Sequence, residues 1–214
     1  SYTGLNHPKD QDKEWAAVNP KNNHVYLTWT QFDDYGSKLE KDQSNILFSV
    51  SKNGGKSWSE AVKINQMPGN CIDDDGTVEG AVPTVGPNGE IYVAWSLNDR
   101  IYFDRSLDGG KTWLATDIVA GKHVGGWDME IPGVGRANGM TVTGCDISNG
   151  PHKGTIYINY ADQRNGENDT DIWLIKSTDG GNTWSQPKRV NDDAAGKHQF
   201  FTWMSVDPVT GHLY

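Results

Sequence analysis

A segment of eight residues occurs three times along the chain, at positions 51–58, 106–113 and 177–184. Each copy starts with serine, contains two consecutive glycines and ends with tryptophan. Apolar and polar residues alternate immediately before each copy, which is the pattern of a half-buried β-strand. Paired glycines beside Asp or Asn favour a tight turn, because glycine adopts positive φ without a steric clash. The repeat therefore predicts three copies of one β-hairpin unit.

A second pattern lies between these turns and completes the unit. Val-Asn-Pro, Val-Gly-Pro and Val-Asp-Pro, ending at Pro20, Pro87 and Pro208, each lead through a turn to a tyrosine that opens another strand. The spacing gives about 63 residues per unit, enough for four short strands. Tandem four-stranded antiparallel units are typical of β-propeller blades. We expect one incomplete domain over residues 1–214, with blade 1 at about 12–66, blade 2 at about 78–120, blade 3 at about 138–191 and the start of blade 4 at about 200–214.

Composition and charge exclude several classes of function. The chain carries 28 Asp and Glu against 19 Lys and Arg, a formal charge of −9, and has no run of basic residues. Nucleic acid is therefore not an expected partner, because binding its phosphates needs a basic surface. No apolar stretch approaches the ~20 residues that cross a bilayer, so no membrane span is expected. Cys71 and Cys145 lack metal-ligand spacing, which leaves either one disulfide or two buried thiols.

The repeated turn resembles the Asp-box, or BNR, signature Ser-x-Asp-x-Gly-x-x-Trp of sialidase-type β-propellers. The resemblance covers about residues 12–214, and only the first copy departs from the signature, with Asn in place of Asp. It implies an all-β propeller, six-bladed when complete, of which this chain supplies about three blades and part of a fourth. Turn chemistry explains every signature position, so we expect structural roles. The signature residues are Ser51, Asn53, Gly55, Trp58, Ser106, Asp108, Gly110, Trp113, Ser177, Asp179, Gly181 and Trp184.

The two faces of such a propeller differ in their loops. The three repeated turns, here called the box turns, share one face with the turns between first and second strands; we call it the box face. The opposite face, here called the loop face, receives the longer connections at about 31–44, 73–79, 98–100, 123–140 and 162–171. Long loops on a rigid scaffold commonly hold binding residues, so the loop face is the candidate functional surface.

The resemblance to sialidases also implies particular residues. In that family an Asp is the acid/base, a Tyr/Glu pair supplies the nucleophile and three arginines hold the substrate carboxylate, as in a retaining exo-glycosidase. Asp42 is the best positional match for the acid/base, with Asp33 and Asp34 as alternatives. Lys13 stands where the family has an Arg-Ile-Pro motif, and an ammonium cannot form the bidentate fork of a guanidinium. The candidate substrate-binding residues are Asp99, Arg100, Arg136, Arg164 and Trp127.

A propeller that binds a glycan or a protein without catalysis is the alternative. Neither activity requires a cofactor, although calcium is a weak candidate, because four carboxylates offer oxygen ligands on the loop face at spacings that match no EF-hand. These carboxylates belong to Asp73, Asp75, Asp169 and Asp171. The expected partners are a glycan or glycoconjugate and the remaining half of the propeller, from another chain or a further segment. The resemblance implies an extracellular, periplasmic or cell-surface location.

Overall fold

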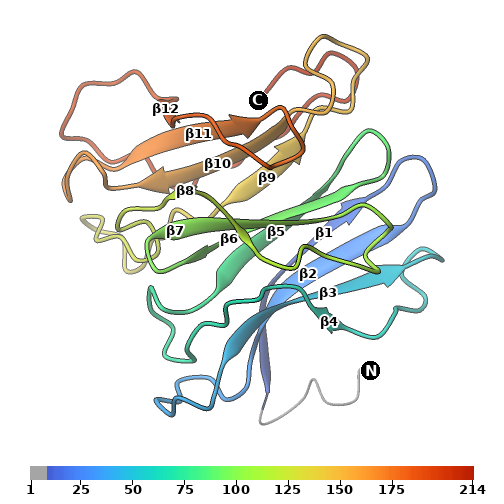
Figure 1. Cartoon of the computed structure of the whole chain (residues 1–214). Coiled ribbons are helices and arrows are strands. Elements are labelled where there is room, and N and C mark those ends of the chain that lie inside the picture. Colours follow the sequence, from blue (N-terminus) through green and yellow to red (C-terminus); the bar gives the residue numbers. More distant parts are fainter. Residues whose placement is uncertain (1–8) are drawn as a thin grey trace.

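The computed structural model describes residues 9–214 and shows strands, turns and loops, with no helix in that range (Figure 1). Twelve strands of the described chain form three four-stranded antiparallel sheets. The first contains β1 (Asp10–Val18), β2 (Val25–Phe32), β3 (Ser44–Ser51) and β4 (Val62–Lys63). The second contains β5 (Glu79–Val85), β6 (Ile91–Leu97), β7 (Arg100–Ser106) and β8 (Ile118–Lys122). The third contains β9 (Val142–Cys145), β10 (Ile156–Asp162), β11 (Asp171–Ser177) and β12 (Lys188–Arg189).

The strands of each sheet follow chain order from the inside of the fold to the outside. β1, β5 and β9 are the first strands of their sheets and lie beside one another, whereas β4, β8 and β12 are outer edges. Figure 1 shows the three sheets succeeding one another along the chain, as blades do. The prediction of an all-β fold made of four-stranded antiparallel blades is therefore confirmed. An isolated antiparallel bridge joins Val206 and Leu213 near the end of the described residues. No helix in residues 9–214 has the length and apolarity of a membrane span.

The box turns owe their shape to a serine and an acidic or amide side chain. Asp108 accepts hydrogen bonds from the backbone N–H of Thr112 at 2.9 Å and from its hydroxyl at 2.7 Å. These bonds hold the pKa of Asp108 down at about 2. In the first turn Asn53 accepts from the backbone N–H of Ser57 at 2.9 Å and donates its amide to the Ser57 hydroxyl at 2.8 Å. Asn53 thus keeps both contacts with residue 57 that Asp108 makes with Thr112.

Neighbouring blades meet through an aromatic pair beside the second and the third box turn. Phe48 of β3 packs against Trp113, with ring centroids 5.1 Å apart and planes at 66°. Phe103 of β7 packs against Trp184 at 5.1 Å and 69°. In both pairs the tryptophan ends the box turn of the next blade, so each blade interface uses the same contact.

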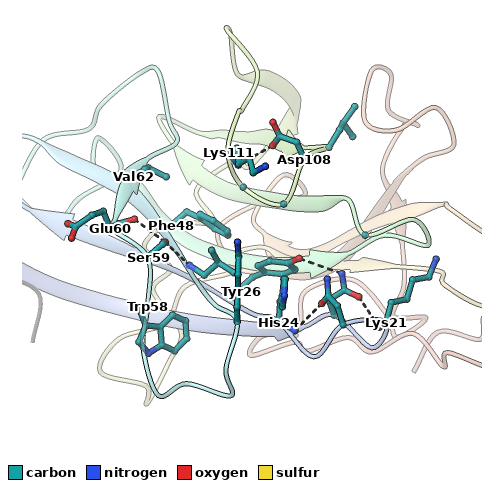
Figure 2. A pocket seen from close by; sticks show the side chains of 18 of the residues that line it. Lys21, His24, Tyr26, Phe48, Trp58, Ser59, Glu60, Val62, Asp108 and Lys111 are labelled. Carbon is teal, nitrogen blue, oxygen red and sulfur yellow. Dashed lines mark hydrogen bonds between the residues drawn. The ribbon is translucent and has the colours of Figure 1, made fainter.

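The second glycine of the box turn makes this contact close. A Cβ on Gly110 would approach the Phe48 ring to 2.2 Å, and one on Gly181 would approach the Phe103 ring to 2.2 Å. Gly55, the equivalent residue of blade 1, has no described neighbour within 4 Å of such a Cβ. We call this contact of glycine, phenylalanine and tryptophan the blade joint. Figure 2 shows the cleft of about 810 Å³ beside it, with Asp108 and Lys111 above Phe48.

Both cysteines are buried thiols, and they form no disulfide. Cys71 lies in the connection between β4 and β5, whereas Cys145 ends β9. Burial raises the pKa of the Cys145 thiol to about 12, which keeps it protonated. Of the two alternatives left open by the sequence, the structure has the pair of free thiols.

Candidate functional site

The predicted acid/base candidates lie on the loop between β2 and β3. Asp33 pairs with Lys9 at 2.6 Å and accepts the backbone N–H of Gln43 at 3.0 Å. Burial raises the pKa of Asp33, but the hydrogen bond and charge of Lys9 outweigh it and the pKa is lowered. Asp34 is exposed. Asp42 is half-buried and accepts the Ser37 hydroxyl at 2.5 Å.

A network on the same face surrounds Asp73. The Tyr35 hydroxyl donates to one oxygen of Asp73 at 2.5 Å, and the Arg136 guanidinium pairs with the other at 3.1 Å. The bond to Asp73 raises the pKa of Tyr35, so the phenol stays protonated. Arg136 also stacks over Trp127, 5.7 Å from the ring centroid. Trp127 is only 3% exposed and donates to the carbonyl of Thr77 at 3.2 Å, so it supports Arg136 from beneath.

A buried ion pair lies at the start of the inner strands. The carboxylate of Glu79, at the start of β5, is fully buried and lies 2.7 Å from the ammonium of Lys13. Neither Glu79 oxygen has another hydrogen-bond partner in the described chain. Burial raises the pKa of Glu79 to about 7, although the hydrogen bond and charge of Lys13 oppose the shift. Lys13 has a φ of 52° at a bulge of β1, and such bulges are frequent beside functional sites.

These residues form one electrostatic unit. The charge of Asp73 raises the pKa of Glu79, and the charge of Glu79 raises the pKa of Arg136, because the two groups lie close enough to interact. We call Lys13, Tyr35, Asp73, Glu79 and Arg136 the charged cluster. Tyr35 and Glu79 were not among the residues predicted from the sequence. The sequence feature that could have identified Glu79 is its position as the one charged residue in the stretch that forms the inner strand β5.

The loop face is hollowed beside this cluster. A cleft of about 1170 Å³ lies between the loop before β9 and the loop between β10 and β11, and both Arg136 and Arg164 line it. We call it the central cleft. The structure thus brings together two predicted substrate-binding residues that are 28 positions apart. Asp42, Asp99 and Arg100 do not line the central cleft.

Arg164 is largely committed to the protein itself. Its guanidinium holds the buried Asp162 carboxylate through contacts of 2.6 and 2.9 Å and donates to the Tyr160 hydroxyl at 2.9 Å. It also lies 4.3 Å from the ring centroid of Trp173. Because only 19% of the side chain is exposed, Arg164 offers a ligand one edge of its guanidinium at most.

Asp99 lies in the turn between β6 and β7, and Arg100 is the first residue of β7. Asp99 accepts the backbone N–H of Gly125 at 2.8 Å, and its own N–H donates to Asp75 at 2.9 Å. Arg100 is exposed. Asp99 and Asp108 lie beyond opposite ends of β7, and hence on opposite faces, as the blade arrangement requires.

The four carboxylates considered for calcium all bind protein donors. Asp73 and Asp75 are described above, and Asp169 accepts the backbone N–H of Gly196 at 2.9 Å. Asp171 is buried and accepts from Arg189, Asn191 and Asn165, each at 2.6 Å. No group of three or more His, Cys, Asp or Glu in residues 9–214 is arranged to hold a metal ion.

Comparison with known proteins agrees with the fold. No protein-family model matches the chain. Among solved structures it is similar to a protein of unknown function from Dyadobacter fermentans, with 18% identity over 94% of this chain and 60% of that chain, at a TM-score of 0.57. The NanB sialidase of Streptococcus pneumoniae matches with 10% identity over 86% of this chain and 40% of that chain, at 0.56. The intramolecular trans-sialidase of Ruminococcus gnavus matches with 12% identity over 87% and 55%, at 0.55.

The chain spans 40% to 60% of the length of these three proteins. Its fold is sialidase-like. At these identities the similarity shows the fold alone, and the role of each side chain rests on its own geometry.

Proposed function

We propose that this propeller acts on glycans through its loop face, as a retaining exo-glycosidase, outside the cytoplasm: in the extracellular space, in the periplasm or at the cell surface. The observation that carries the proposal is the charged cluster beside the central cleft. Arg136 is held by Asp73 and Trp127, and Lys13 is held by Glu79, so two cations have fixed positions on one face. Preorganised cations favour a sugar that carries a carboxylate, because little side-chain freedom is lost on binding.

The chemistry assigned to this chain is binding and proton transfer. Arg136, which is 50% exposed, contacts the anionic group of the sugar. Asp42, as general acid, gives its proton to the glycosidic oxygen while the bond from that oxygen to the anomeric carbon breaks and a nucleophile from the remaining blades of the ring bonds to that carbon. Lys13 and Tyr35 are the further polar side chains of the charged cluster that face the sugar. Tyr35 offers the sugar a hydrogen-bond acceptor, since its single hydroxyl proton is donated to Asp73.

Release of a fluorophore from a sialoside tests the proposal. We expect turnover by the wild-type protein with its ring completed and a loss of about 100-fold or more for Asp42→Ala, the usual contribution of a general acid. Glu40→Ala is the matched control, because Glu40 is an exposed carboxylate on the same loop. Absence of turnover by the wild type, or equal rates for Asp42→Ala and Glu40→Ala, removes Asp42 from this role.

A non-catalytic binding propeller is the second candidate. This candidate is favoured because predicted site residues already pair with other side chains of the protein. Asp33 is paired with Lys9, and Arg164 is paired with the buried Asp162. Glycan binding that depends on Arg136 but is never followed by cleavage would support this candidate over the enzyme.

We also propose that further blades complete the ring. The blade joint supports this, because Gly110 and Gly181 lie over phenylalanines of the preceding blade whereas Gly55 has no such neighbour in the described chain. A partner presenting an apolar ring to Gly55 fits this site. Analytical ultracentrifugation of the chain alone should show self-association, and a stable monomer would contradict the proposal.

A further inference from the structure

A second cleft, of about 820 Å³, lies between the outer strand of blade 2 and the sheet of blade 3. We call it the side cleft. Val119 of β8, which is 47% exposed, and Trp184 after β11 contribute apolar surface. Arg100 and Lys122 line its end at the loop face. Its size falls within the ~300–1,000 Å³ typical of small-molecule sites.

The two cations at this end are an unusual pair. Arg100 of β7 and Lys122 of β8 stand directly opposite each other in the sheet. Both are exposed, and neither forms an ion pair with any residue in the part of the chain that the structure describes. Like charges directly opposite each other on neighbouring strands are destabilising. Folding gains nothing from this pair, whereas an anion placed between the two side chains would relieve the repulsion.

The local backbone directs the pair into the side cleft. The register of β7 and β8 shifts between Ile101 and Tyr102, which leaves Ala120 of β8 unpaired next to the two cations. A bulge of this kind increases the twist of an edge strand and changes the direction of the following side chain. Ala120, Gly121 and Lys122 all line the side cleft.

The side cleft adjoins the central cleft. Val124 and Arg164 line both, so the two share a wall, and the guanidinium of Arg164 donates to the carbonyl of Lys122 at 3.3 Å. Within the described chain, Arg100 and Lys122 are the unpaired cations of the side cleft, Asp99 is its one lining carboxylate, and the charge of Arg164 is balanced by Asp162. The chain as a whole has the opposite bias, with 28 acidic against 19 basic side chains.

We propose that the side cleft binds an acidic oligosaccharide, with one sugar carboxylate held between Arg100 and Lys122 and the sugar ring against Val119 and Trp184. If the central cleft holds the sugar that is cleaved, the side cleft holds the following sugars of the same chain, and this assignment rests on the proposed function. Binding at Arg100 and Lys122 itself does not. The site selects glycans that carry a carboxylate on more than one unit.

Calorimetric titration with an oligosialic acid trimer tests this inference, with maltotriose as the neutral counterpart. The Asp42→Ala background is used so that turnover does not consume the trimer. We expect the trimer to bind and maltotriose not to, with binding weakened by salt as for exposed charges. Arg100→Ala and Lys122→Ala should each weaken trimer binding about five- to tenfold, the loss of roughly one charge-assisted contact.

Lys188→Ala is the matched control, because Lys188 is an exposed lysine on β12, the outer strand of blade 3. It should leave binding unchanged. Arg100→Lys should retain most of the affinity, and neither alanine variant should lower the thermal midpoint, since each removes a repulsion. Trimer affinity unchanged in both alanine variants, or lowered equally by Lys188→Ala, would overturn the inference. Trimer binding through Arg100 without any sialoside turnover would instead refute the catalytic proposal and leave the side cleft standing.

Discussion

The blade joint gives a quantitative prediction, because two adjacent glycines of one box turn differ in a single respect. Gly109 and Gly110 have φ values of 77° and 89°, which disfavour any residue with a Cβ. A Cβ on Gly109 meets no atom within 4 Å, whereas one on Gly110 lies 2.2 Å from the Phe48 ring. Gly109→Ala therefore measures only the cost of placing a residue with a Cβ at positive φ. Gly110→Ala adds the cost of the steric clash with Phe48.

The magnitudes follow from these two costs. A left-handed conformation costs an L-residue about 1–2 kcal/mol, and overpacking a filled core adds ~1–3 kcal/mol. We expect Gly110→Ala to lower the free energy of unfolding by about 2–5 kcal/mol and Gly109→Ala by about 1–2 kcal/mol. Gly55→Ala should resemble Gly109→Ala, because Gly55 has a φ of 84° and no neighbour within 4 Å in the described chain.

Urea unfolding followed by tryptophan fluorescence measures these differences, provided that the slope with denaturant is unchanged among the variants. The double variant Gly110→Ala with Phe48→Leu should recover part of the loss if the ring causes it. Equal losses for Gly55→Ala, Gly109→Ala and Gly110→Ala would refute the reasoning, since the backbone alone would then account for the cost.

Three further outcomes follow from buried groups. Burial raises the pKa of Glu79 from 4.5 to about 7, so its contribution to the free energy of unfolding is complete below pH 4.5 and is lost as the pH rises to 7. In Glu79→Gln the thermal midpoint should therefore depend less on pH between 4.5 and 7 than in the wild type. Arg164→Ala should cost about 3–5 kcal/mol in chemical denaturation, because it leaves the buried Asp162 carboxylate unpaired, and Arg164→Lys should restore part of that loss. Cys71 and Cys145 should react with a thiol reagent only after unfolding, since both are buried; fast reaction of the native chain would contradict the structure.

Much of the fold could be predicted because its signals are local. The box turns need specific residues within a few positions of one another, and the strands beside them alternate in polarity. Both features are present in the sequence before any tertiary contact forms. In the structure the strands of the three sheets lie within residues 10–63, 79–122 and 142–189.

The charged cluster could not be predicted in the same way. Arg136 reaches Asp73 from 63 positions away, and Tyr35 reaches it from 38. The pairing of Lys13 with Glu79 depends on β1 and β5 lying side by side. Such contacts come from blade packing, and the same packing buries Trp127, which the sequence had suggested as a surface for a sugar.

The blade joint has a direction. The box turn of blade 2 packs on the sheet of blade 1, and the box turn of blade 3 packs on the sheet of blade 2. A duplicated gene segment encoding one unit would therefore carry both the donor and the acceptor of the contact, and each new copy would fit its neighbour without compensating changes. Growth of such a protein is limited only by the rotation per blade, which fixes the number of copies at which the box turn of the first blade meets the sheet of the last.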